Sequence, residues 1–160
     1  MTRAYISVGS NQEPRAHVLK ALDELEAAFG KVDQSPVYES VAVGFSGENF
    51  LNLVVGFDTS MTIEQVAEVL DRIEQSCGRV RGGERFSSRT MDLDLLLFGD
   101  FVRHDELWDI PRKEIEQYAF VLKPLVDLAA EEVHPELGKT YSRLWKEGEF
   151  SGQGLWEVSL

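Results

Sequence analysis

Apolar positions recur with two different periods along the chain, and each period predicts one kind of secondary structure. Residues 3–10, "RAYISVGS", alternate between apolar and polar positions and predict a strand that ends at Gly9. From Pro14 onward apolar residues recur at helical spacing as far as Gly30, and they predict a helix over that stretch: Val18, Leu22, Leu25 and Phe29.

Two further strands and a second helix follow with the same kinds of signal. Residues 31–40 and 49–59 are rich in β-forming side chains, and the glycine-containing segment 41–48 between them predicts a mobile hairpin loop. Residues 62–78 predict a helix, because Thr62 and Gln65 match a capping box and an apolar stripe follows: Val66, Val69, Leu70, Ile73 and Cys77. Because Cys77 belongs to that stripe, we interpret it as a small core residue rather than a nucleophile.

Residues 91–99, "MDLDLLLFG", predict the next strand. The resulting order of strand, helix, strand, strand, helix, strand predicts an α+β fold with a ferredoxin-like βαββαβ core. Residues 101–111 predict an added hairpin, and residues 118–130 and 141–148 predict shorter, partly helical C-terminal segments. No repeat or shift in composition divides the chain, so we expect a single domain over residues 1–160.

Composition and charge narrow the class of protein. The 160 residues are 43% hydrophobic and 28% charged, as in an ordinary soluble globular protein, and no apolar run approaches the length of about 18 residues that a membrane span needs. A single cysteine excludes an intramolecular disulfide and suits a reducing cytoplasm, where we expect the protein to act. The net charge of −12 argues against nucleic-acid or membrane partners, and we expect small-molecule substrates. We expect a monomer, with a dimer left open.

One segment runs against the acidic character of the chain. Residues 72–89 hold five of the ten arginines against two glutamates. Clustered guanidinium groups suit the recognition of phosphate or carboxylate oxygens. The segment therefore predicts an anion-binding loop, with a solvated surface loop as the alternative.

Two carboxylates interrupt the apolar strand at 91–99. Asp92 and Asp94 are two positions apart, so both project from one face, with Cα atoms about 6.5 Å apart. A buried carboxylate needs a compensating positive charge, which a metal ion, a cationic ligand or the arginines would supply. Two hard oxygen ligands on one strand suit Mg²⁺ with substrate phosphates, and Arg89 just ahead of them favours that interpretation.

A second group of candidate residues lies in the strand at 49–59. Phe50 and Asn52 share a face, where an aromatic ring beside an amide would stack on and read a planar heterocycle. Ordinary packing is the alternative interpretation. The three histidines, His17, His104 and His134, lack the spacing of metal ligands.

These segments, taken in order, are similar to a known family. The motifs "AYISVGSN", "NFLN", "RIEQSCGRVR", "RTMDLDLLLFG" and "FVLKPLVDLA" resemble the 6-hydroxymethyl-7,8-dihydropterin pyrophosphokinase family over about 130 residues. The resemblance implies a ferredoxin-like fold and an ATP- and Mg²⁺-dependent enzyme of folate biosynthesis. In that reaction the pterin hydroxymethyl oxygen attacks the β-phosphorus of ATP, and AMP leaves.

The resemblance also assigns roles to residues. Asp92 and Asp94 would bridge two Mg²⁺ ions to the triphosphate, with Asp92 also next to the substrate. The pterin would be read by Asn52 between the rings of Phe50 and Phe120. ATP would be bound by Glu74 and by the arginines of a mobile catalytic loop, Arg79, Arg81 and Arg89.

Four positions depart from the family pattern. "FSSR" at 86–89 replaces Trp-Gly-Pro-Arg, and "SVAV" at 40–43 replaces a Thr-Pro-Pro pattern. Arg112 replaces a histidine and keeps a cation near the phosphates, whereas Tyr118 replaces an arginine. Besides the family reaction, two other interpretations therefore stay open: a paralogue acting on another pterin-like alcohol, and a non-catalytic pterin- or nucleotide-binding module. A generic ferredoxin-like interaction domain is the remaining alternative.

Overall fold

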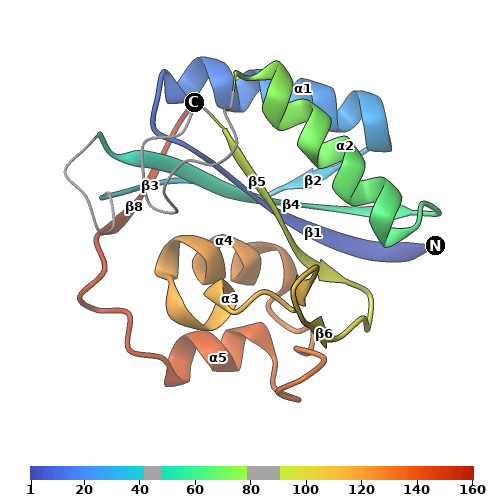
Figure 1. Cartoon of the computed structure of the whole chain (residues 1–160). Helices are drawn as coiled ribbons and strands as arrows, with labels where there is room; N and C mark the ends of the chain where they lie inside the picture. Colours follow the sequence, from blue (N-terminus) through green and yellow to red (C-terminus); the bar gives the residue numbers. More distant parts are fainter. Residues whose placement is uncertain (42–47, 79–90) are drawn as a thin grey trace.

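The computed structural model describes residues 1–41, 48–78 and 91–160. A central sheet separates two layers of helices, with α1 and α2 on one face and α3, α4 and α5 on the other (Figure 1). The strands are β1 (Thr2–Ser10), β2 (Asp33–Gln34), β3 (Val37–Ser40), β4 (Phe50–Thr59), β5 (Asp92–Phe98), β6 (Arg103–His104), β7 (Asp109–Ile110) and β8 (Leu155–Val158). The helices are α1 (Pro14–Phe29), α2 (Ile63–Ser76), α3 (Glu114–Gln117), α4 (Ala119–Ala129) and α5 (Tyr141–Glu147).

The strand order of the main sheet is that of a ferredoxin-like fold. Its strands lie in the order β5-β1-β4-β3-β8, and β2 also pairs with β4. All of these pairings are antiparallel. The first four strands in this order, with α1 and α2, form the βαββαβ core, so the predicted α+β fold class is confirmed.

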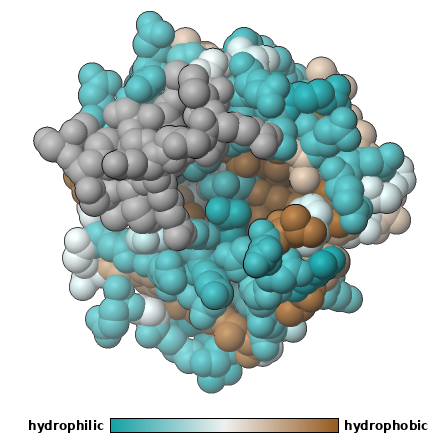
Figure 2. Space-filling model, viewed as in Figure 1, coloured by the Kyte–Doolittle hydropathy of each residue, from teal (hydrophilic) through white to brown (hydrophobic). Residues whose placement is uncertain are grey.

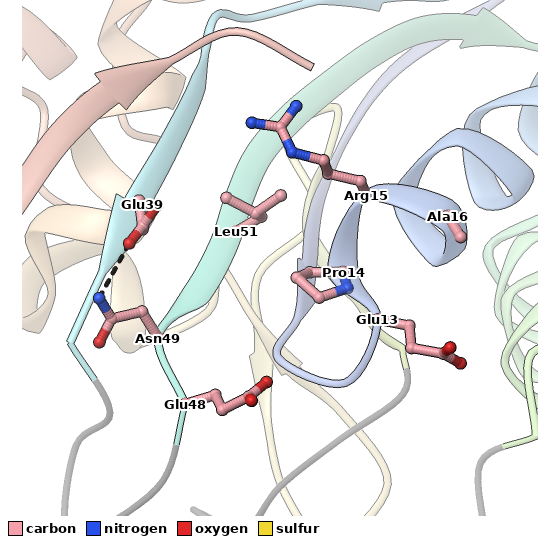
Figure 3. A pocket seen from close by; sticks show the side chains of 8 residues that line it. All are labelled: Glu13, Pro14, Arg15, Ala16, Glu39, Glu48, Asn49 and Leu51. Carbon is pink, nitrogen blue, oxygen red and sulfur yellow. Dashed lines mark hydrogen bonds between the residues drawn. The ribbon is translucent and has the colours of Figure 1, made fainter.

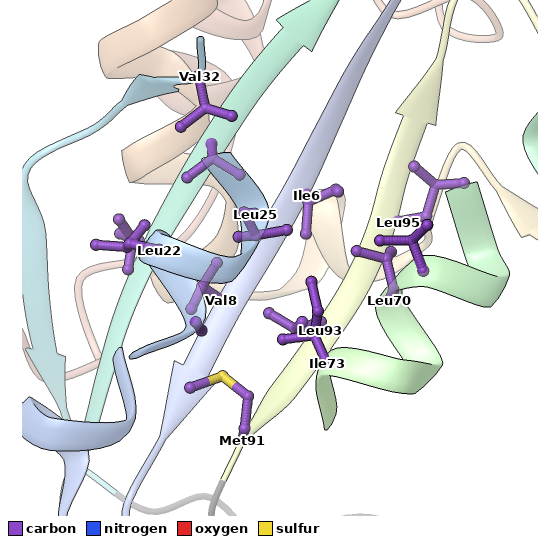
Figure 4. Packing of buried hydrophobic residues seen from close by; sticks show 14 of the residues in the cluster. Ile6, Val8, Leu22, Leu25, Val32, Leu70, Ile73, Met91, Leu93 and Leu95 are labelled. Carbon is purple, nitrogen blue, oxygen red and sulfur yellow. The ribbon is translucent and has the colours of Figure 1, made fainter. Parts of the chain in front are cut away.

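The first hydrophobic core lies between the sheet and the helix pair α1 and α2. Figure 4 shows Leu22 and Leu25 of α1 and Leu70 and Ile73 of α2 pointing toward the strands, with Ile6 of β1 between the two helices. The capping box of α2 forms as predicted, because the Thr62 hydroxyl accepts from Gln65 N–H and the Gln65 side chain accepts from Thr62 N–H. Cys77 is buried in this core, as predicted, and burial raises the pKa of its thiol.

The second core lies on the opposite face of the sheet, beneath α4 and α5. It contains Tyr5 and Val54 from the strands and Leu122 and Leu125 from α4, with Tyr141 at the start of α5. The phenol group of Tyr5 donates a hydrogen bond to Glu132, and that of Tyr38 donates to Asp127 of α4. The second contact ties α4 to β3, and the first ties the residues after α4 to β1.

The structure differs from the predicted elements at three places. The strand predicted over 31–40 is divided into β2 and β3, because Pro36 has no N–H and the Ser35 hydroxyl accepts the N–H of Val54. Short helix α3 was not predicted, and neither was strand β8. The hairpin predicted over 101–111 is present as β6 and β7, whereas the predicted loops at 42–47 and 79–90 lie outside the described residues.

Within the described ranges, no helix is both long enough and apolar enough to cross a membrane.

Candidate active site

Strand β5 directs its two aspartates toward the α3–α4 side of the sheet. The side chains of Met91, Leu93 and Leu95 are 0, 5 and 7% exposed and belong to the first core. Alternation along the strand therefore turns Asp92 and Asp94 to the opposite face, where both are partly exposed. The predicted division of this strand between core and carboxylates is confirmed.

A single row of residues runs from the aspartates across the sheet. Asp92 is opposite Gly9, Gly9 is opposite Asn52, and Asn52 is opposite Tyr38. Residues directly opposite one another share a face, and two strand spacings of about 4.8 Å place Asp92 and Asn52 roughly 10 Å apart. A Cβ atom on Gly9 would lie 3.3 Å from Asn52 Oδ1. The missing side chain of Gly9 therefore allows Asn52 to pack close against β1.

The Asn52 side chain is held from the neighbouring strand. Asn52 is 3% exposed, and its Nδ2 donates to Ser40 Oγ over 2.7 Å. Ser40, also buried, ends β3, and its partner across the ladder is Phe50. Phe50 and Asn52 are two positions apart on β4 and so share a face, as predicted. The hydrogen bond to Ser40 fixes the orientation of the Asn52 amide.

Arg112 supplies a positive charge beside the carboxylates. Its Nη2 lies 3.6 Å from Asp94 Oδ1, and its Nε lies 3.0 Å from Glu114 Oε2. The backbone N–H of Arg112 donates to Leu96 O over 3.0 Å, which ties this segment to β5. The sequence left open which positive charge compensates the two carboxylates, and in the structure Arg112 is one such charge that lies close to Asp94.

The carboxylates remain short of positive charge despite Arg112. Burial and the neighbouring charge of Asp92 raise the pKa of Asp94 to about 7, against the opposing effect of Arg112, and Glu74 and Glu114 add to the increase. A nearby cation stabilises the ionised form of a carboxylate held in such surroundings.

The donor set suits a hard divalent cation. The described ranges contain no group of three or more His, Cys, Asp or Glu side chains arranged to enclose a metal ion. Mg²⁺ is commonly held through one or two carboxylates, with water and substrate phosphates completing the shell. Asp92 and Asp94 supply two such carboxylates. The raised pKa of Asp94 shows that added positive charge would stabilise the pair.

Glu74 approaches β5 from helix α2. Its Oε2 accepts the backbone N–H of Leu93 over 2.8 Å, and the residue is 8% exposed. β5 is at the end of the sheet, so this carboxylate takes the place of a further strand at Leu93. Glu74 thereby fixes the backbone between the two aspartates.

Helix α4 contributes aromatic rings at its first turn. The rings of Tyr118 and Phe120 stack with their centroids 5.0 Å apart and their planes 19° apart. Both rings pack at the margin of the second core, on the face of the sheet that carries Asn52. Tyr118, which departs from the family pattern, thus supports Phe120.

Comparison with known proteins identifies the family. The family model described as 7,8-dihydro-6-hydroxymethylpterin-pyrophosphokinase (HPPK) matches residues 5–130. The chain belongs to the HPPK family.

Relatives with this name cover most of the chain. A 2-amino-4-hydroxy-6-hydroxymethyldihydropteridine pyrophosphokinase of Pseudomonas aeruginosa is 40% identical over 136 residues, covering 79% of this chain and 80% of that protein. The protein of that name from Bacillus subtilis is 33% identical over 152 residues and 90% of both chains. Among solved structures, a Plasmodium falciparum HPPK-DHPS superposes with a TM-score of 0.73 over 91% of this chain and 44% of that one. At 16% identity this last similarity shows the fold alone.

The HPPK site predicted from sequence is thus brought together in part. Asp92, Asp94, Arg112 and Glu74 meet at β5, and Asn52 lies two strands away on the same sheet. The loop arginines, Arg79, Arg81 and Arg89, lie outside the described residues, as does the whole segment "FSSR" at 86–89. Sequence reasoning missed Gly9 and Ser40. Gly9 was noted as the end of a predicted strand and Ser40 as the first residue of the departing segment "SVAV", but neither signal indicated a position beside Asn52.

Concavities lie at the surface of the part of this HPPK chain that the structure describes. Figure 2 shows a hollow near the centre of one face, between the layers of Figure 1, with hydrophobic residues set back among hydrophilic ones. A separate cavity of about 730 Å³ lies between the start of α1 and the ends of β3 and β4 (Figure 3). Arg15, Glu39 and Leu51 line it, and Leu51 belongs to the first core. None of the predicted site residues that the structure describes lines this cavity, and Asp92 and Asn52 lie on the face of the sheet opposite to Leu51.

Proposed function

We propose that the protein transfers pyrophosphate from ATP to the hydroxymethyl group of 6-hydroxymethyl-7,8-dihydropterin and releases AMP. The observation that carries the proposal is the row from Asp92 through Gly9 to Asn52, which sets a carboxylate and a buried amide on one face of the sheet in a member of the HPPK family. The names of the curated relatives point to the same reaction.

The phosphate side of the site is assigned to β5 and its surroundings. Asp92 and Asp94 would hold Mg²⁺, which when bound supplies charge neutralisation for the triphosphate. Arg112 is within reach of Asp94 and would pair with phosphate oxygens. We assign the same role to Arg79, Arg81 and Arg89, and we propose that Glu74 keeps the strand in place on the nucleotide side.

The pterin side is assigned to β4 and α4. One Asn52 N–H is already donated to Ser40, which leaves its other N–H and its carbonyl oxygen for the donor and acceptor edge of a pterin. Phe50 and Phe120 would offer aromatic faces to the ring. Gly9 lets the Asn52 carbonyl oxygen lie close to β1, where a Cβ would crowd it.

The proposed chemistry requires positioning rather than a dedicated base. The pterin hydroxyl oxygen forms a bond to the β-phosphorus, the bond from that phosphorus to the oxygen bridging to the α-phosphate breaks, and AMP leaves with the electron pair. The hydroxyl proton passes to solvent. Charge neutralisation by the arginines and alignment of the two substrates lower the barrier.

A direct assay tests the proposal. Protein, MgATP and 6-hydroxymethyl-7,8-dihydropterin are mixed, and AMP and the pterin pyrophosphate are measured by chromatography. We expect both products in equal amounts with the wild-type protein and neither with Asp94→Ala. Asp100→Ala, in the exposed turn after β5, serves as the matched control and should retain activity. Pterin binding without AMP release by the wild-type protein would overturn the proposal.

A further inference from the structure

The C-terminal segment of the chain crosses from one layer of the fold to another. Residues 150–158, called here the C-terminal strap, leave α5, pass the end of the helical layer and reach β8 beside β3 (Figure 1). Phe150 stacks on Trp145 of α5 with ring centroids 4.9 Å apart, which anchors the start of the strap. The family match ends at residue 130, so the strap lies beyond the part of the chain that identifies the family.

The strap first attaches beside the stacked rings of Tyr118 and Phe120, called here the Phe120 wall of the proposed pterin site. Gln153 Oε1 accepts the backbone N–H of Ala119 over 2.7 Å, and Gln153 Nε2 donates to Gln117 O over 2.9 Å. The N–H groups of a first helical turn lack partners within the helix, so Gln153 caps α4. Its two hydrogen bonds flank Tyr118, the residue whose ring stacks on Phe120.

The strap attaches a second time beside Ser40 and the Asn52 amide that Ser40 holds, called here the Asn52 wall of the proposed pterin site. In the ladder between β3 and β8, Leu155 is opposite Ser40 and Glu157 is opposite Tyr38. Ser40 in turn accepts the hydrogen bond from Asn52. At the end of the strap Val158 packs against the first core, and the following residue, Ser159, accepts a hydrogen bond from Arg15 through its carbonyl oxygen over 2.7 Å.

Only one residue separates the two attachments. Gln153 and Leu155 are two positions apart, and two residues of chain span at most about 7 Å. The start of α4 and the end of β3 are therefore connected by a short tether that limits how far they can separate.

We propose that the C-terminal strap sets the separation between the Phe120 wall and the Asn52 wall of the pterin site, with Gln153 as its positioning residue. This proposal rests on the proposed function, because it concerns the same site. Gln153 does not need to touch the substrate: it fixes the turn that carries Tyr118 and Phe120. Its loss would widen the pterin side of the site and leave the nucleotide side, built on β5 and Arg112, unchanged.

The test compares full-length variants at Gln153. For Gln153→Ala we expect both the Kd for the pterin, measured by fluorescence titration, and its KM to rise about tenfold, the effect of losing one to two ordinary hydrogen bonds. The KM for ATP and the kcat should stay within about twofold of the wild-type values, because nucleotide contacts are retained. Gln153→Glu keeps the acceptor for Ala119 N–H but removes the donor to Gln117 O, so it should show a smaller increase.

Controls separate positioning from general damage. Ser151→Ala, on an exposed position of the same strap, should match the wild-type protein in every measurement. Urea unfolding midpoints of all variants should agree within about 0.5 M, which shows that the fold is retained. An unchanged pterin Kd in Gln153→Ala, or equal increases for pterin and ATP, would overturn the role of the strap. A wild-type protein that binds pterin without releasing AMP overturns the proposed reaction instead, while its pterin Kd still tests the strap. A wild-type protein that binds no pterin overturns both.

Discussion

Replacing Asp94 with asparagine should make the protein more stable and inactive at the same time. Asp94 shares its surroundings with Asp92, Glu74 and Glu114, and these negative charges together with burial raise its pKa to about 7. Asparagine has nearly the same shape as aspartate and carries no charge. The substitution therefore removes the repulsion and retains the packing of β5.

The size of the gain follows from the displaced pKa. Each pKa unit is worth about 1.4 kcal/mol, so the displacement of the Asp94 pKa from 3.8 to about 7 corresponds to roughly 4 kcal/mol of unfavourable free energy at pH 8. Solvent reaches 31% of this side chain, and screening reduces the expected gain to about 2 kcal/mol. Because the pKa of Asp94 is raised in the folded state, the free energy of unfolding of the wild-type protein falls by this amount as pH rises from about 4 through 7.

The assay is urea unfolding followed by tryptophan fluorescence, at pH 8 and at pH 4.5, with EDTA to remove metal ions. We expect Asp94→Asn to exceed the wild-type free energy of unfolding by about 2 kcal/mol at pH 8 and by much less at pH 4.5. Added Mg²⁺ should stabilise the wild-type protein only, since binding to the folded state adds stability. Asp100→Asn is the matched control and should show neither effect. A variant that is no more stable than wild type at pH 8 would refute the repulsion between the carboxylates.

Three further predictions concern other parts of the molecule. Gly9→Val should weaken pterin binding at least tenfold in a fluorescence titration while cooperative unfolding is retained, because even a Cβ would approach Asn52 Oδ1 to 3.3 Å and a valine would displace the amide; wild-type affinity would contradict the assignment of Asn52 to the pterin. Tyr38→Phe should lower the free energy of unfolding by about 1 kcal/mol through loss of the hydrogen bond to Asp127, and no change in urea unfolding would show that this contact contributes nothing. Glu136 and Asp109 raise the pKa of His104, so the stability advantage of wild type over His104→Gln should be full below about pH 6.5 and decline as pH rises through the raised pKa; equal advantages at pH 6 and pH 9 in thermal unfolding would refute this.

The core of the fold was predictable because its signals are local. Helix α2 has a capping box and a stripe of apolar residues, and β5 alternates between core leucines and the two aspartates. Each pattern depends on residues a few positions apart, so periodicity alone indicates the element and the side it buries. The ferredoxin-like order then follows from the sequence of elements.

The parts that sequence reasoning missed depend on partners far along the chain. Strand β8 has four residues in a glycine-containing tail, and it forms because β3 offers an unpaired edge more than a hundred residues earlier. The family resemblance placed Arg112 near the phosphates, but its contact with Asp94 requires the turn after β7 to return to β5, and nothing in the sequence near Arg112 indicates that path. Gly9 was visible as the end of a strand, but its role between Asp92 and Asn52 becomes apparent only once the register is known.

That register also determines when during folding the site comes into existence. The row from Asp92 through Gly9 and Asn52 to Tyr38 joins four strands whose positions in the chain range from residue 9 to residue 92. Such long-range pairings close late, because loop-closure entropy must be overcome before they contribute. A chain with only its helices and local turns formed would lack any part of the row. Ligand affinity should therefore appear in a refolding experiment together with the last cooperative step of sheet formation, which makes substrate binding a reporter of the completed fold.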